Sequence, residues 1–308
     1  MKAWLQFFRL PNLPTAPGDA LAGAAVVLLL RDGSLSAALA AGGAALFLYM
    51  YGLADNDVVG AAADAVNAPE RPIPRGEISL RTAKFARSAC LFLALMTGAA
   101  AHLPPGWWLG AALLTAAICT YNRVKSLWLM GLSRGLSVLC GTLAVLPARV
   151  TFRGYPAELL MAGALALGWT LYIAAVTRLS EGEESACEGL SPRRYLLGLA
   201  AFVPLLAAGP YFFFAHPAGD SRGLVPLLFP VLGCLWAYAR WCAAVAPLGV
   251  PHGPETRRPA VGRAIGALLY LQLGFLLLAP HRAFVAVAAA LWFSARLIRR
   301  YAPRISGS

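Results

Sequence analysis

The residues best suited to chemistry lie in one stretch, where Asn56 and Asp57 are followed by Asp64. Asp57 and Asp64 are seven residues apart, which is two turns of an α-helix, so both carboxylates would face the same way about 10 Å apart. Carboxylates of this kind suit Mg²⁺, which takes oxygen ligands and usually shares them with substrate phosphates. The pattern therefore predicts an Mg²⁺ site at Asp57 and Asp64, with Asn56 beside it.

A basic loop braced by prolines follows directly and contains Asn67, Arg71 and Arg75. An arginine guanidinium can hold two phosphate oxygens through parallel hydrogen bonds. Carboxylates next to such arginines are suited to Mg²⁺ bound together with a diphosphate. The alternative interpretation is a solvated, charge-balanced loop, and for Asp55 and Glu77 taken singly we prefer that alternative.

Two later segments carry residues that suit the same ligand. Tyr121 and Lys125 are four residues apart and share a helix face, where the lysine can reach a phosphate and the tyrosine can hydrogen-bond to it. Glu183 and Glu184 follow the sixth apolar run and could form the opposite wall of a metal site. The plainer alternatives are an interfacial tyrosine with a topology-setting lysine, and a solvated acidic loop.

Three residues at the start of the chain are also candidates. Arg9 and Asn12 open the first crossing, where they either approach the diphosphate or serve as an interfacial arginine and a turn residue. Asp19 lies within the first apolar run. An acid at membrane depth is a functional candidate, unless a bend in the chain exposes it to water.

The elements that must position these residues are membrane helices. Of the 308 residues, 59% are hydrophobic and only 13% are charged, against about 25% charged in a soluble domain. A crossing needs about 20 apolar residues. We therefore predict an all-α, polytopic transmembrane bundle of nine to ten crossings, with one domain over residues 1–308. The apolar runs fall near 14–30, 36–54, 83–103, 106–121, 133–148, 157–177, 194–215, 223–246, 262–280 and 283–298.

The composition and the charge pattern exclude several classes of protein. The long Ala- and Leu-rich runs disfavour a β-barrel, whose strands alternate apolar and polar residues. With ten crossings and a cytoplasmic N-terminus, 21 of the 26 Lys and Arg residues fall on the inner side, as the positive-inside rule requires. We expect an integral protein of a bacterial inner membrane, with the N-terminus and the acidic loops in the cytoplasm. The net charge of +12 then reflects the inner loops and does not indicate nucleic-acid binding.

The first loop carries a specific resemblance to the UbiA superfamily of intramembrane prenyltransferases. The family's first motif, N-D-x-x-D-x-x-x-D, is matched by Asn56, Asp57 and Asp64, and Gly60 stands where the family has its middle aspartate. The family's N-x-P-x-R-P-I-P-x-G is matched over residues 67–76. The resemblance extends over most of the chain.

Other segments resemble one branch of that superfamily. The family's Y-x-x-x-K is matched by Tyr121 and Lys125. Members that transfer prenyl groups carry a second aspartate motif after the sixth crossing, and this chain has no aspartate there. Its VTRLSEGEES looks like the EboC-type loop, with Glu183 at the glutamate position, and RLPNLPTAPGDALAG is also similar to that branch.

The resemblance implies two four-helix groups around a central cavity that opens to lipid and is capped by cytoplasmic loops. It implies an enzyme of isoprenoid biosynthesis, a Mg²⁺-dependent transferase of prenyl groups. The substrates would be an isoprenoid diphosphate and a lipophilic or aromatic acceptor within the membrane. The expected catalytic residues are Asp57, Asp64 and Glu183, and the expected metal ligands are these three with Glu184. The expected diphosphate-binding residues are Arg9, Asn12, Asn56, Asn67, Arg71, Arg75, Tyr121 and Lys125.

Two other functions stay open. Gly60 and the missing second aspartate motif favour a catalytically weak or inactive relative that binds or transports a lipophilic biosynthetic intermediate. An ion-coupled transporter is disfavoured, because it would need ionisable groups near the bilayer midplane, and Asp19 is the one acid that comes near.

Overall fold

A computed structural model of the chain describes residues 2–147, 154–181, 198, 200–204, 225–250, 253–279 and 281–306. Over these ranges the secondary structure is helical without strands, which confirms the all-α prediction. The elements are α1 (Lys2–Phe7), η1 (Leu10–Asn12), α2 (Thr15–Leu30), α3 (Leu35–Asn67), α4 (Leu80–Ala100), α5 (Pro105–Val124), α6 (Leu127–Val145), α7 (Pro156–Ser180), α10 (Val225–Val245), η2 (Ala246–Gly249), α11 (Pro254–Leu276) and α12 (Arg282–Ser306).

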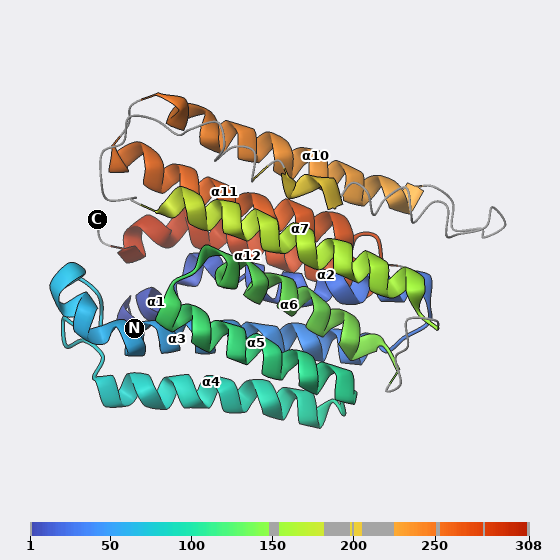
Figure 1. Cartoon of the computed structure of the whole chain (residues 1–308), viewed down its shortest axis with the longest axis horizontal. Coiled ribbons are helices and arrows are strands. Elements are labelled where there is room, and N and C mark those ends of the chain that lie inside the picture. The colour runs from blue at the N-terminus through green and yellow to red at the C-terminus, as the bar shows by residue number, and fades with distance from the viewer. Residues whose placement is uncertain are drawn as a thin grey trace.

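Seven of the described helices are long and apolar enough to cross a membrane: α2 with its preceding turn, α3, α4, α6, α7, α10 and α11. The chain is therefore an integral membrane protein. Helices α5 and α12, of 20 and 25 residues, run alongside them in the bundle (Figure 1). The total of nine to ten crossings stays a prediction, because most of residues 182–224 lie outside the described ranges.

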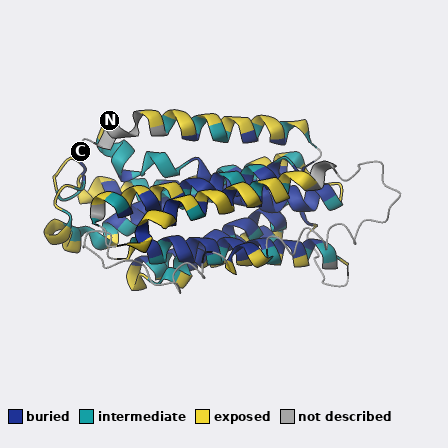
Figure 2. Ribbon diagram, turned by 90° about the horizontal axis from the view of Figure 1, so that it is seen from above, coloured by how far each residue is buried: buried dark blue, intermediate teal, exposed yellow. Residues whose placement is uncertain are grey.

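The helices form two packed groups that meet at α2 and α6. One core lies around the fully buried Trp169, Tyr172 and Trp241 and joins α2 and α6 to α7, α10 and α11. A second core lies around Leu48 and Trp107 and joins the four helices α3, α4, α5 and α6. Figure 2 shows buried residues inside the bundle and exposed residues on the outward sides of its helices. Those outward sides include many large apolar side chains, as expected of surfaces that contact lipid.

Glycines bring α2 and α6 into backbone contact. A Cβ atom added to Gly141 would lie 1.7 Å from the carbonyl oxygen of Ala20, and one added to Gly23 would lie 2.0 Å from that of Val138. Small residues at such crossings allow membrane helices to gain packing energy that lipid cannot supply. The two helices are thus held in one register, which matters because both carry residues of the cavity described below.

Helix α3 continues well past its apolar run. It begins at a Ser34 cap, whose hydroxyl accepts a hydrogen bond from the Ala37 amide at 3.1 Å. It then runs for 33 residues to Asn67, two residues before Pro69. A proline cannot continue a helix, and it disfavours helical backbone in the residue before it. The motif of Asn56, Asp57 and Asp64 is therefore helical throughout, as its seven-residue spacing predicts.

Candidate functional site

A cavity of about 790 Å³ lies at the end of the bundle where α3 and α5 end. Its walls come from the N-terminal segment, α3, the loop after α3, the junction between α5 and α6, and the facing sides of α7 and α11. The side toward α7 and α11 is apolar and includes Ile173, Val176 and Leu268. The opposite side carries most of the charged residues, so one cavity joins a charged region to an apolar one.

Most of the residues singled out from the sequence line this one cavity, although they come from four separate segments. They are Arg9, Asn12, Asn56, Asp57, Asp64, Arg71, Tyr121 and Lys125.

Four singled-out residues are not brought to the cavity by the described structure. Asn67 is the last residue of α3 and is exposed. The Arg75 guanidinium is half exposed, and it lies 2.8 Å from Glu77 rather than among the lining side chains. Glu183 and Glu184 lie outside the described residues.

The two aspartates of α3 share one arginine. Arg71 Nη1 lies 2.7 Å from Asp64 Oδ2 and 4.0 Å from Asp57 Oδ1. Arg9 Nη2 donates a hydrogen bond to the same Asp57 oxygen at 3.2 Å. The Asp57 side chain is 8% exposed and that of Asp64 is 15% exposed. Both carboxylates therefore face one region, and two arginines balance their charge there.

Lys125 extends back from the end of α5 toward α3. Its Nζ donates a hydrogen bond to Asn56 Oδ1, and it lies 5.5 Å from the centroid of the Tyr121 ring. Burial lowers the pKa of Lys125 below its ordinary value, and the nearby Arg9 charge lowers it further, while Asp64 opposes the shift. Arg9 and Arg71 already pair with Asp57 and Asp64, whereas the hydrogen-bond partner of Lys125 is the neutral Asn56, so a bound anion would supply the negative charge next to Lys125.

Two of the basic residues are held in unusual backbone conformations. Arg9 has φ 44° and Lys125 has φ 56°, both in the left-handed region. Among the described residues other than glycine, only His102 shares a positive φ. Such a conformation costs of the order of 1–3 kcal/mol and persists where surrounding structure enforces it, often at functional sites. At Lys125 it ends α5 and starts the turn into α6.

Asp55 fixes the rotation of α3. Its side chain is 2% exposed; Oδ1 accepts a hydrogen bond from Arg87 Nη1 at 3.2 Å, and Oδ2 accepts one from Asn122 Nδ2 at 2.8 Å. The interpretation of Asp55 as a solvated charge is therefore wrong, because α3 presents it to α4 and α5. By holding that side of the helix, it leaves Asn56 and Asp57 facing the cavity.

Arg134 also lines the cavity, although the sequence analysis did not single it out and placed it only at the start of the apolar run 133–148. Helix α6 begins at Leu127, so Arg134 lies two turns inside it and is 9% exposed. Its Nε lies 2.9 Å from Asp19 Oδ2, and its Nη2 donates to the Thr15 carbonyl at 3.2 Å. The one sequence signal was an arginine just inside an apolar stretch.

Asp19 is wholly buried and is not exposed to water by a bend. Besides Arg134, its partners are Trp169 Nε1, which donates to Oδ1 at 2.8 Å, and Gln272 Nε2, which donates to the same oxygen at 2.6 Å. These donors come from α7 and α11 and reach α2 across the bundle. A buried carboxylate needs such partners to stay charged.

No protein-family model matches the chain. Over 146 residues, 47% of this chain, it is 34% identical to digeranylgeranylglyceryl phosphate synthase of Ignicoccus hospitalis. The chain spans about half of the length of that curated relative, 46% of it.

Two solved structures are similar over nearly the whole chain. A structure of digeranylgeranylglyceryl phosphate synthase matches with a TM-score of 0.55 and 17% identity, over 94% of this chain and 98% of that one. The apo structure of a UbiA homologue from Aeropyrum pernix K1 matches with a TM-score of 0.57 and 19% identity, over 86% of this chain and 97% of that one. At these identities the likeness shows a shared fold, and the UbiA-like fold predicted from the sequence is confirmed.

Proposed function

We propose that the protein is an intramembrane prenyltransferase of the UbiA superfamily. It would transfer a prenyl group from an isoprenoid diphosphate to a lipophilic or aromatic acceptor, with Mg²⁺. The observation that carries the proposal is that Asp57 and Asp64, together with the cations Arg9, Arg71 and Lys125, meet an apolar wall in one cavity. The partial identity to digeranylgeranylglyceryl phosphate synthase supports it. The proposal includes membership of the EboC-like branch and a cavity mouth that faces the cytoplasm of a bacterial cell.

The donor set of α3 fits Mg²⁺. Asp57 and Asp64 are both within 4.0 Å of one Arg71 nitrogen, so their oxygens lie close enough to act on one bound group. Mg²⁺ prefers such carboxylate oxygens and completes its shell with phosphate oxygens and water. Asp57 and Asp64 would hold the ion, which would supply electrostatic stabilisation of the leaving diphosphate.

The cations at the mouth would bind the diphosphate itself. Arg9 and Arg71 now pair with the carboxylates, and phosphate oxygens would give their guanidinium groups stronger, bidentate partners. Lys125 would add a third positive charge from α5. When the allylic C–O bond breaks, its electron pair stays on the diphosphate, and these fixed cations stabilise that added charge without reorganising.

The apolar wall would protect the other fragment. Ile173, Val176 and Leu268 offer no nucleophile and exclude water, which would otherwise capture the allylic carbocation. The rings of Tyr49 and Tyr121 also line the cavity, and an aromatic face stabilises a nearby cation. The acceptor then supplies the electron pair of the new bond and loses a proton.

A direct assay tests this function. Purified protein in detergent is incubated with geranyl, farnesyl or geranylgeranyl diphosphate, with Mg²⁺ or with a chelator, and both binding and diphosphate release are measured. We expect Mg²⁺-dependent binding and release in the wild type, and loss of both in Asp57→Asn. Glu77→Gln is the matched control, because Glu77 pairs with Arg75 away from the cavity. Absence of binding at millimolar Mg²⁺ would refute the proposal.

One observation favours the second candidate, a weak or inactive relative that binds or carries a lipophilic intermediate. At Gly60 the three atoms nearest to an added Cβ belong to the Asp64 side chain, at 3.5 Å and beyond, so a side chain would fit in ordinary van der Waals contact where the family has its middle aspartate, but no carboxylate is there. Within the described ranges, no three His, Cys, Asp or Glu residues come together as a metal site. In the same assay, this candidate predicts binding of the diphosphate without its release.

A further inference from the structure

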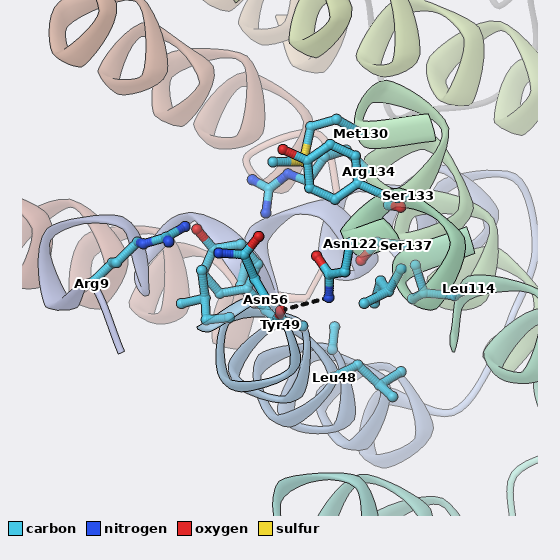
Figure 3. A pocket seen from close by; sticks show the side chains of 16 residues that line it. Arg9, Leu48, Tyr49, Asn56, Leu114, Asn122, Met130, Ser133, Arg134 and Ser137 are labelled. Atoms are coloured by element: carbon cyan, nitrogen blue, oxygen red, sulfur yellow. Dashed lines mark hydrogen bonds between the residues drawn. The ribbon is translucent and has the colours of Figure 1, made fainter. Parts of the chain in front are cut away.

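A smaller pocket of about 80 Å³ continues from the cavity between α3, α5 and α6 (Figure 3). It shares Arg9, Tyr49, Asn56 and Arg134 with the cavity, and beyond them it is lined largely by apolar side chains such as Leu114. Because the two spaces share these lining residues, a ligand bound in the cavity can extend into the pocket beside the charged region where the diphosphate is proposed to bind. The pocket is therefore placed to receive a part of a second reactant.

The helix face of α6 brings two uncommitted polar groups into the pocket. Arg134 uses Nε on Asp19 and Nη2 on Thr15, whereas its third nitrogen, Nη1, has no acceptor among the described residues. Ser137 is one turn further along α6 and 6% exposed, and its hydroxyl likewise has no partner in the described part of the chain. Both atoms reach the open space of the pocket, so a polar ligand there can hydrogen-bond to them.

The charges around the pocket determine which kind of polar group of a ligand can bind there. Asp19 is wholly buried at 2.9 Å from Arg134 and offsets its charge, and Trp169 and Gln272 hold Asp19 in place. Arg9, the other cation that lines the pocket, is paired with Asp57 at 3.2 Å. A carboxylate entering the pocket would therefore lose its hydration and meet only cations whose charge is already balanced. A hydroxyl or carbonyl oxygen would accept a hydrogen bond from Arg134 Nη1 at a much smaller desolvation cost.

We infer that this pocket binds an uncharged, oxygen-bearing group of the acceptor, a hydroxyl or a carbonyl, through Arg134 and Ser137. The inference rests on the proposed prenyl transfer and narrows its acceptor class: it excludes acceptors that would place a free carboxylate in this pocket. Asp19 is then a positioning residue, which keeps Arg134 neutralised and directed at the pocket.

Two small probes of similar size and different charge, benzyl alcohol and benzoate, test the inference. Their dissociation constants are measured by saturation-transfer NMR titration of the full chain in detergent. We expect the wild type to bind benzyl alcohol at least tenfold more tightly than benzoate. Ser137→Ala should raise the dissociation constant of benzyl alcohol about fivefold, which corresponds to the loss of one net hydrogen bond. Ser133→Ala is the matched control. It should change the dissociation constant of benzyl alcohol less than twofold, because the Ser133 hydroxyl already donates to the Leu129 carbonyl at 2.8 Å.

A substitution that changes the charge next to Arg134 tests the inference independently. Asp19→Asn removes the compensating charge, so the benzoate to benzyl alcohol preference should shift at least tenfold toward benzoate. Where this variant fails to fold, the wild-type preference and the pair of serine variants decide the question. A wild-type preference for benzoate, equal effects of Ser133→Ala and Ser137→Ala, or no binding of either probe would overturn the inference.

Mg²⁺-dependent binding of geranyl diphosphate, measured on the same samples, separates this inference from the proposed function. Retained diphosphate binding with no probe binding overturns the pocket assignment alone. Lost diphosphate binding with the expected alcohol preference overturns the prenyltransferase proposal and leaves the pocket's chemistry supported.

Discussion

Arg71 and Arg75 share a loop and a residue type but not a set of partners. Arg71 contacts the carboxylates of Asp57 and Asp64, whereas Arg75 pairs with Glu77 near the surface. Arg71→Lys keeps the charge and loses the planar fork that binds two phosphate oxygens. We expect it to weaken Mg²⁺-dependent binding of geranyl diphosphate about tenfold, equal to about 1.4 kcal/mol. Titration of Arg75→Lys should show less than a twofold change, and equal losses would show that the loop acts only as a diffuse charge.

Gly60 is the position where a single side chain would change the metal site. A Cβ there would meet nothing closer than Asp64 Oδ2 at 3.5 Å, so an aspartate fits without displacing the backbone. Gly60→Asp adds a third carboxylate, and we expect the affinity for Mg²⁺ to rise several-fold. If the wild type is slow because it lacks this metal ligand, diphosphate release should also become faster. Gly60→Asn has the same size without the charge and separates the charge effect from a gain in helix propensity. An asparagine variant that matches the aspartate variant would contradict the metal-ligand explanation.

At the scale of helices, the contact between α2 and α6 should control both stability and the site. A Cβ on Gly141 would overlap the Ala20 carbonyl oxygen at 1.7 Å, so Gly141→Ala must separate the two helices. Overpacking of this kind costs about 1–3 kcal/mol, and we expect a lower melting temperature in detergent with weaker diphosphate binding. Gly163→Ala in α7 is the control, because no atom lies within 4 Å of the added Cβ. A melting temperature lowered equally by both substitutions would show that α2 and α6 have room to move.

The whole molecule has two ends that should lie on opposite sides of the membrane. Asp32, in the exposed turn between α2 and α3, lies at one end of α3, and Ala65 lies near the other, about 50 Å away for a 33-residue helix. Figure 1 shows the start of α1 and the end of α12 at the end where α3 finishes. With the six native cysteines replaced, an impermeant maleimide should label Asp32→Cys but not Ala65→Cys in intact cells. Permeabilised cells should show labelling of both, and the reverse pattern in intact cells would invert the topology.

The sequence by itself determined the features that depend on neighbours along the chain. Apolar runs of about 20 residues predict membrane helices because backbone groups in lipid must be paired within their own segment. The seven-residue spacing of Asp57 and Asp64 placed both carboxylates on one side of α3, since helical periodicity is a local property. The same reasoning gave only approximate helix ends, and it missed that α6 starts early enough to enclose Arg134.

Only the tertiary structure decided which of these residues share an environment. Asp19 pairs with Arg134 and accepts from Gln272, residues 115 and 253 positions away, and Arg9 reaches Asp57 across 48 positions. The tertiary structure also gives Arg71 and Arg75 different partners, and it buries Asp55 against α4 and α5. Whether a charge is solvated, paired or directed at a cavity depends on side chains that other helices bring to it. Those contacts follow from how the helices pack, which depends on glycine crossings and side-chain shapes across the whole bundle rather than on spacing along one segment.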